Sequence, residues 1–107
     1  MTPTRTGTAS AGAAVAASDT VSVNQLGVNG AWLEIINGNA STDNMTITDA
    51  GSTPAGNALS GGTYPVSVTN ATSKIFYLSP KQADPVNGIT ITHSVTSTVT
   101  YKLYPLG

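Results

Sequence analysis

Cysteine is absent from this sequence of 107 residues, and charged residues are scarce. Without cysteine, a disulfide scaffold, thiolate metal ligands and thiol catalysis are all excluded. Only 8% of the residues are charged, against about a quarter in an ordinary soluble domain, and the net charge is −1. Since phosphate binding depends on clustered Lys and Arg, we expect no nucleic-acid partner.

Long apolar runs are missing as well. No stretch approaches the roughly 20 apolar residues that cross a bilayer, so we expect no membrane partner. The segment 1–17 combines Arg5 with many alanines, as a signal peptide does, but it contains no Leu, Ile or Phe. We therefore expect no secretion signal.

Hydroxyl side chains supply the polarity that charges do not. The chain contains seventeen threonines, with Ser, Asn and Gly close behind. Threonine favours β-strands and leaves a polar group on the outer side of a sheet. The length suits a single domain, and a core of this size would gain stability from association with further copies.

Short segments of alternating apolar and polar residues recur along the chain, separated by Gly, Asn, Pro and Asp. This period predicts an all-β protein, an antiparallel β-sandwich (jelly-roll or Ig-like) of about seven or eight short strands. No window has the apolar spacing of an amphipathic helix, so we predict no amphipathic helix. The predicted strands are 14–17, 20–23, 31–37, 44–48, 64–69, 74–78, 89–95 and 99–103.

Two of these predictions are more specific. The segment 31–37 is the most apolar of the chain, so we place it at the centre of a sheet. The segments 89–95 and 99–103 alternate most regularly, and we predict that they pair through a short Thr/Ser turn.

The first twelve residues differ from the rest because none of them can anchor a core. We predict an extended N-terminal arm at 1–12, followed by the sandwich domain at 13–107. Such a segment is either a disordered terminus or an arm that becomes ordered on a neighbouring subunit. In the second case the residues that bind the neighbouring protein are Thr2, Pro3, Thr4, Arg5, Thr6, Gly7 and Thr8.

Residues able to do chemistry are few and scattered. His93 is the only histidine and shares the inward register of Ile91, so we predict a packed side chain rather than a general base. Asp43 and Asp49 flank the strand 44–48, where with Asn44 they could offer oxygen ligands to calcium or, alternatively, cap turns. We predict that the protein is not an enzyme and has no catalytic residue, metal or cofactor.

The six aromatic residues have two interpretations. Most aromatic side chains of a small sandwich lie in the core, which we predict for Trp32 and Phe76. Exposed tyrosines could instead form a platform for sugar rings, together with the long loop at 49–62. The tyrosines are Tyr64, Tyr77, Tyr101 and Tyr104.

Short sequence segments spread over nearly the whole chain resemble those of small virion proteins of tailed phages that infect actinobacteria. They are Ala-Ala-Val-Ala-Ala-Ser-Asp-Thr (13–20), Glu-Ile-Ile-Asn-Gly (34–38), Thr-Ile-Thr-Asp-Ala-Gly (46–51), Ala-Gly-Asn (55–57), Ile-Thr-His-Ser (91–94) and Tyr-Lys-Leu-Tyr (101–104). Those proteins look like capsid decoration, or cement, proteins. The resemblance implies a β-sandwich on the outer surface of an icosahedral shell, often a trimer where capsomers meet.

The function expected from this resemblance is structural. The partners would be the major capsid protein and further copies of the chain in a homotrimer. The location would be the outside of the virion capsid, after synthesis in the cytoplasm of the bacterial host. Two other functions stay open: a carbohydrate-binding or host-adhesion module, and a structural protein of the tail or the head–tail joint.

Overall fold

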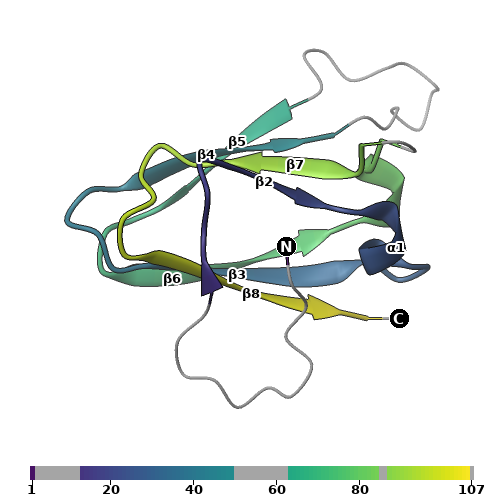
Figure 1. Ribbon diagram of the computed structural model, residues 1–107, viewed down its shortest axis with the longest axis horizontal. Coiled ribbons are helices and arrows are strands. Elements are labelled where there is room, and N and C mark those ends of the chain that lie inside the picture. Colours follow the sequence, from purple (N-terminus) through teal and green to yellow (C-terminus); the bar gives the residue numbers. More distant parts are fainter. Residues whose placement is uncertain (2–12, 50–62, 85–86, 107) are drawn as a thin grey trace.

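The computed structural model describes residues 1, 13–49, 63–84 and 87–106, which form two antiparallel sheets packed face to face (Figure 1). The β3 sheet has the strand order β1-β8-β3-β6, and the β4 sheet has the order β2-β7-β4-β5. The predicted all-β sandwich is confirmed. The strands are β1 (Ala13–Ala14), β2 (Ser18–Val21), β3 (Ala31–Asn37), β4 (Asp43–Thr48), β5 (Thr63–Val68), β6 (Thr72–Leu78), β7 (Ile89–Thr92) and β8 (Val99–Pro105).

The strands pair in a nested order along the chain. β1 pairs with β8, β2 with β7, β3 with β6 and β4 with β5. The pairs β3–β8 and β4–β7 then join these units into the two sheets. This is the order of a jelly roll, in which one long antiparallel hairpin is rolled into a sandwich. Of the two arrangements that the sequence left open, the structure has the jelly roll.

The central position predicted for 31–37 is confirmed, because β3 lies between β8 and β6. The predicted pairing of 89–95 with 99–103 is wrong. β7 belongs to the β4 sheet and β8 to the β3 sheet, so the connection at 93–98 crosses between the sheets. Four predicted strands also end early, since β1 stops at Ala14, β2 at Val21, β5 at Val68 and β7 at Thr92.

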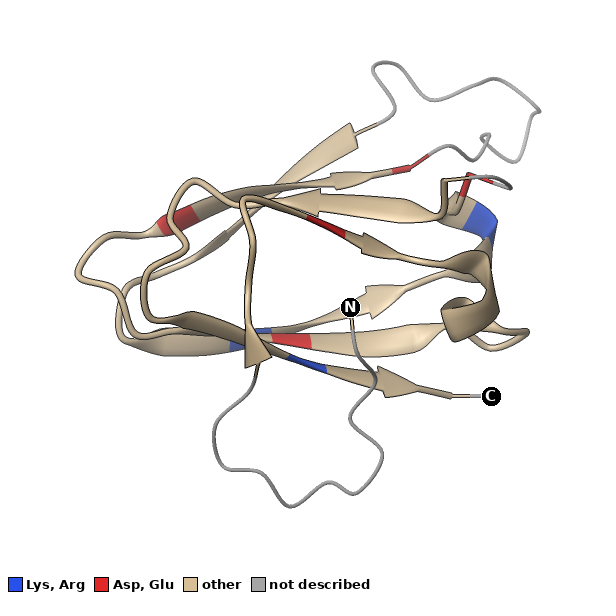
Figure 2. Ribbon diagram, viewed as in Figure 1, with Lys and Arg blue, Asp and Glu red and all other residues tan. Residues whose placement is uncertain are grey.

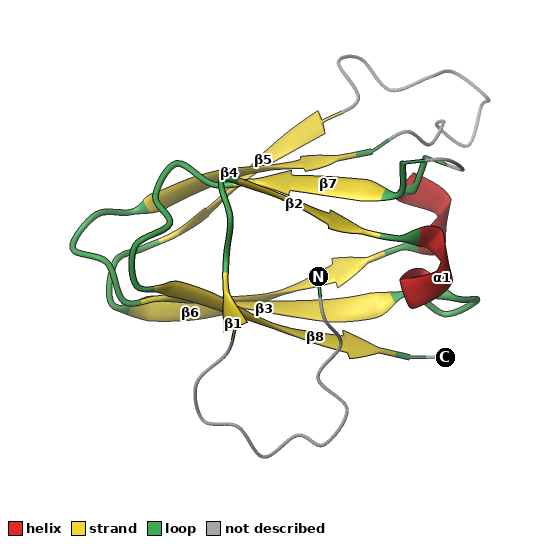
Figure 3. Cartoon of the chain, in the orientation of Figure 1, coloured by secondary structure: helices red, strands yellow, loops and turns green. Residues whose placement is uncertain are grey.

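The described residues also form two short helices that the apolar pattern did not indicate (Figure 3). They are α1 (Val23–Leu26) and the 3₁₀ helix η2 (Pro80–Gln82). Both begin with a capping box, in which the side chains of two residues each accept the other's backbone N–H. The pairs are Ser22 with Gln25 at α1 and Ser79 with Gln82 at η2. These helices are too short to show an apolar period, so the local caps were the only sequence signal.

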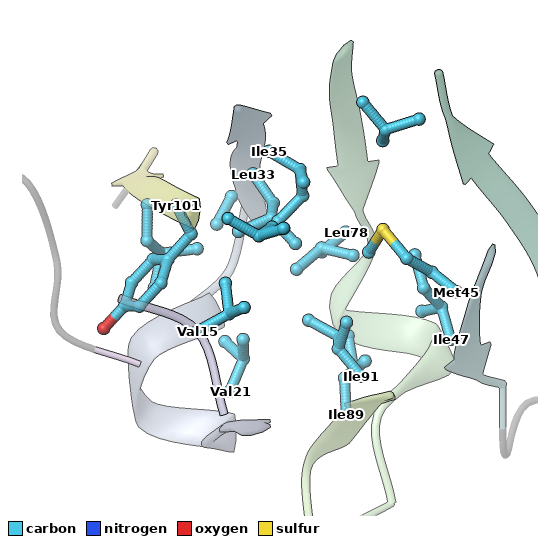
Figure 4. Close-up of a cluster of buried hydrophobic side chains, with 14 of the residues drawn as sticks. Val15, Val21, Leu33, Ile35, Met45, Ile47, Leu78, Ile89, Ile91 and Tyr101 are labelled. Atoms are coloured by element: carbon cyan, nitrogen blue, oxygen red, sulfur yellow. The ribbon is translucent and has the colours of Figure 1, made fainter. Parts of the chain in front are cut away.

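The core lies between the inner faces of the two sheets (Figure 4). Alternation along each strand places every second apolar side chain there, as with Leu33 and Ile35 on β3 and Met45 and Ile47 on β4. Leu26 of α1 is also fully buried. The fully buried side chains come from both sheets, so the sandwich has a single core.

Candidate functional site

The two outer faces of the sandwich have different chemistry. On the β4 sheet the outward positions carry hydroxyl, amide or proline side chains and no charge. Thr46 and Thr92 hydrogen-bond each other across β4 and β7, and the Thr90 N–H donates to the Thr48 Oγ1 at 2.9 Å. The outward positions are Ser18, Thr20, Asn44, Thr46, Thr48, Thr63, Pro65, Ser67, Thr90 and Thr92.

The outer face of the β3 sheet carries the exposed large apolar side chains of the strands. Trp32 is 42% exposed, Tyr77 44% and Ile75 59%. Tyr104 of β8 lies directly opposite Trp32 and is half-buried. Exposed apolar side chains gathered on one face mark a binding surface in soluble proteins. We call the four side chains Trp32, Ile75, Tyr77 and Tyr104 the aromatic face.

Trp32 is held in place from one side by Tyr77. Their ring centroids are 5.3 Å apart and the rings are inclined at 60°, an edge-to-face arrangement. The Tyr77 hydroxyl donates to the Asn29 carbonyl at 2.7 Å. Gly30 makes room for this contact: it has φ +83°, and a Cβ there would lie 2.8 Å from the Tyr77 hydroxyl and 2.4 Å from the Leu78 carbonyl oxygen.

An open hollow of about 530 Å³ lies on this face and is lined by Trp32, Glu34, Ile75 and Tyr104. The lining comes from β3, β6 and β8, so it exists only where the three strands are side by side. Glu34 is half-buried and is the only charged residue in the lining. A carboxylate therefore stands among apolar and aromatic surfaces.

Charges are sparse over the whole molecule (Figure 2). Lys102 lies opposite Glu34 on β8, whereas Lys74 on the edge strand β6 pairs with Ile35 and takes the other side of the sheet. Among the described residues, neither Glu34 nor Lys102 takes part in a side-chain hydrogen bond or an ion pair. Within the described ranges, the carboxylate in the hollow therefore has no direct counter-ion.

His93 and Asp43 form a buried contact that the sequence did not predict. His93 Nδ1 and Asp43 Oδ2 are 2.6 Å apart, and both side chains are fully buried. Asp43 Oδ1 accepts the backbone N–H of Ser94 at 3.0 Å and of Val95 at 3.4 Å. Because the carboxylate accepts all of these bonds, we assign the donated proton to His93 Nδ1.

This pair has the geometry of a structural contact. His93 Nε2 is buried and has no hydrogen-bond partner in the described part of the chain, so the pair does not open onto the surface of the described residues. The packed histidine that the sequence predicts is confirmed, one residue beyond β7. The sequence did not indicate its partner, which lies fifty residues earlier in the chain.

The calcium interpretation of Asp43 and Asp49 is not supported by the geometry. Asp43 opens β4 and Asp49 follows its last residue, so six extended residues hold them roughly 20 Å apart. No group of three or more His, Asp or Glu within the described ranges could hold a metal ion. Turn-capping is also wrong for Asp43, since its carboxylate bonds the distant β7–β8 connection and His93.

The predictions for the aromatic residues are partly confirmed and partly wrong. Phe76 packs against the core and Tyr101 is buried, but Trp32 is exposed, which corrects its assignment to the core. The signal was in the alternation: Trp32 has the same parity as Glu34, whereas Leu33 and Ile35 take the inner side. Tyr64 lies on the other sheet and accepts a hydrogen bond from Gln82 at 2.9 Å, so it does not join the aromatic face.

The predicted arm residues Thr2 to Thr8 and most of the loop 49–62 lie outside the described residues. Met1 is described: its amino group donates to the Thr20 carbonyl at 2.6 Å, and its own carbonyl accepts from the Gln25 side chain. Met1 is also partly buried against the core, which corrects the prediction that none of the first twelve residues can anchor one. The loop leaves and rejoins the β4 sheet at Asp49 and Thr63, so its anchor points are not on the aromatic face.

Comparisons with known proteins found no matching family model, curated protein or solved structure. Within the described residues, no helix has the length and apolar character needed to cross a membrane.

Proposed function

We propose that this chain is a non-enzymatic structural protein of a virion, a decoration protein that binds the outer surface of a tailed-phage capsid and stabilises it. The observation that carries the proposal is the difference between the two outer faces. The aromatic face supplies Trp and Tyr, which contribute most per residue to protein interfaces. The hydroxyl-covered face of the β4 sheet carries no charge and suits contact with water.

In this proposal the sandwich lies flat on the shell, with the β3 sheet against the major capsid protein and the β4 sheet outward. Copies associate as a trimer, so that modest contacts of each copy add up to stable attachment. The near-neutral surface lets identical neighbours pack closely without mutual repulsion. The resemblance to small virion proteins supports the same location.

Co-sedimentation with purified empty shells tests this orientation. Trp32→Ala and Tyr104→Ala remove the apolar contact area, so we expect shell binding to fall by tenfold or more, as it does for the central residues of many interfaces. The matched controls are Thr20→Lys and Thr46→Lys on the outer face of the β4 sheet, for which we expect binding close to that of the wild type.

Equal binding by all four variants, or loss only in the threonine variants, would contradict the orientation. Failure of the wild-type protein to bind shells at all would contradict the decoration role. A position at the tail or the head–tail joint in an electron-microscopy map of the particle would instead assign the chain to that part of the virion.

A carbohydrate-binding or adhesion module is the second candidate, favoured by the exposed rings beside a carboxylate in the hollow. Sugar rings stack on such side chains, and carboxylates accept their hydroxyl groups. A glycan array distinguishes the candidates, because a decoration protein should bind shells and give no signal on the array.

A further inference from the structure

We propose that the hollow on the β3 sheet binds an arginine side chain of the partner protein. This inference deepens the proposed function and rests on it, because it specifies the chemistry of the shell surface against which the aromatic face lies. Three observations carry it: the unpaired carboxylate, the aromatic walls and the fixed position of Trp32.

The carboxylate of Glu34 defines the charge of the occupant. Glu34 is half-buried, it is the only charged group among the described residues that line the hollow, and no described residue forms an ion pair with it. Covering the hollow with a neutral partner would remove this charge from water without compensation, which is costly. Lys102 lies opposite Glu34 but forms no ion pair with it, so a cation from the partner would supply the direct contact that Lys102 does not.

The aromatic walls favour arginine as this cation. A guanidinium group is planar and stacks on Trp and Tyr rings, and its fork of N–H donors matches the two oxygens of a carboxylate. Trp32 and Tyr104 provide the rings and Glu34 the oxygens, all within one hollow. A neutral sugar would also stack on the rings, but it would gain nothing from the charge.

The position of Trp32 is set before the partner arrives. Tyr77 packs against its ring, and the Tyr77 hydroxyl is itself fixed by the Asn29 carbonyl at 2.7 Å. A fixed ring loses little conformational entropy on binding, so more of the contact energy remains as affinity. Lys102, opposite Glu34, lies outside the lining and opposes a bound cation through like charge.

Trp32 is the only tryptophan of the chain, so its fluorescence reports directly on the hollow. The probe is N-acetyl-arginine amide, titrated to about 100 mM into the full-length protein because a single side chain is expected to bind in the millimolar range. The matched neutral probe is N-acetyl-citrulline amide, which has nearly the same shape without the charge. We expect a saturable change with the arginine probe alone.

Three variants sharpen the test. Glu34→Gln should weaken arginine binding about tenfold, because a charge-assisted bond is lost. Lys102→Gln should strengthen it a few-fold, because a repelling cation is removed. Lys81→Gln removes a positive charge from η2, away from the hollow, and should leave the affinity unchanged. All variants should keep the wild-type circular dichroism spectrum.

The arginine inference is overturned if the arginine probe gives no saturable change, if the citrulline probe acts equally well, or if Glu34→Gln has no effect. A saturable change with methyl glucoside that Glu34→Gln leaves intact would overturn it in favour of sugar binding. The proposed function fails separately: wild-type protein that binds the arginine probe but no shells would contradict only the decoration role. Shell binding that depends on Trp32 but not on Glu34 would contradict only the arginine inference.

Discussion

At the scale of single residues, three of the buried polar residues, Asn37, Asp43 and His93, hold one end of the sandwich together. Asp43 ties the start of β4 to His93 and to the backbone that follows it. Asn37, at the end of β3, donates to the carbonyls of Ser41 at 3.0 Å and of Val68 at 2.9 Å. Side chains thus replace strand pairing where the chain passes between the sheets.

His93→Ala should lower the free energy of unfolding by about 3 to 5 kcal/mol, because it leaves the Asp43 carboxylate buried without its side-chain partner. His93→Gln should cost less, since its amide can still donate to Asp43. Urea denaturation followed by circular dichroism measures both values. The control Thr96→Ala, an exposed position in the same connection, should change stability by less than about 0.5 kcal/mol.

Shell binding provides the second measurement for this site. The structural role predicts that folded His93→Gln protein binds shells as the wild type does, since the pair lies in the interior and not on the aromatic face. Loss of binding by a variant that remains folded would mean that His93 takes part in function.

At the scale of secondary-structure elements, each sheet has two edge strands whose backbone groups could pair with another chain. The β3 sheet ends in β1, which has only two residues, and in β6, where the edge carries Lys74. The β4 sheet ends in β2 and β5, and β5 contains Pro65. Short edges, charge and proline all disfavour edge-to-edge association.

Pro65→Val should allow β5 to pair with another copy of the chain, because it adds a backbone N–H on the open side of the edge and a side chain that favours strands. We expect a concentration-dependent increase in mass beyond that of the wild-type protein, measured by light scattering after size-exclusion chromatography. Ser67→Val is the control, since it adds the same side chain on the same face of β5 without adding an N–H. If both variants or neither variant associated, the proline would have no protective role.

The strands were largely predictable from the alternation of apolar and polar residues, whereas the short helices were not. Period-2 alternation located the segments that became strands, because each strand buries one side and exposes the other. It did not indicate α1 or η2, which depend on the capping pairs Ser22–Gln25 and Ser79–Gln82 rather than on an apolar period. The alternation also led to the wrong pairing of 89–95 with 99–103, because it does not indicate which sheet a strand enters.

At the scale of the whole molecule, the nested pairing makes the two ends of the chain depend on each other. β8 pairs with both β1 and β3, so the last strand in sequence completes the sheet that carries the aromatic face. β1 contributes only Ala13 and Ala14 at the edge. The C-terminal strand should therefore be essential for folding, whereas the segment before β1 should not.

Two deletions test this difference. Removing residues 98–107 takes away β8 and should abolish the cooperative unfolding transition, because the core loses Val99, Tyr101 and Leu103. Removing Thr2–Gly12 should leave a cooperative transition but abolish shell binding or trimer formation. Unchanged binding and oligomeric state after the second deletion would remove the arm, including Thr2 to Thr8, from the proposed interface.

The sequence by itself determined the strand segments and the side of each strand that a residue takes. The alternation Trp32-Leu33-Glu34-Ile35 already separates an inner from an outer side, because the side-chain period of a strand is two whatever surrounds it. The tertiary structure alone decided which strands are neighbours. The hollow joins Glu34 to Ile75 and Tyr104 across β3, β6 and β8, and His93 meets Asp43 across fifty residues. Such contacts depend on the order in which the rolled hairpin brings strands together, which no local pattern encodes.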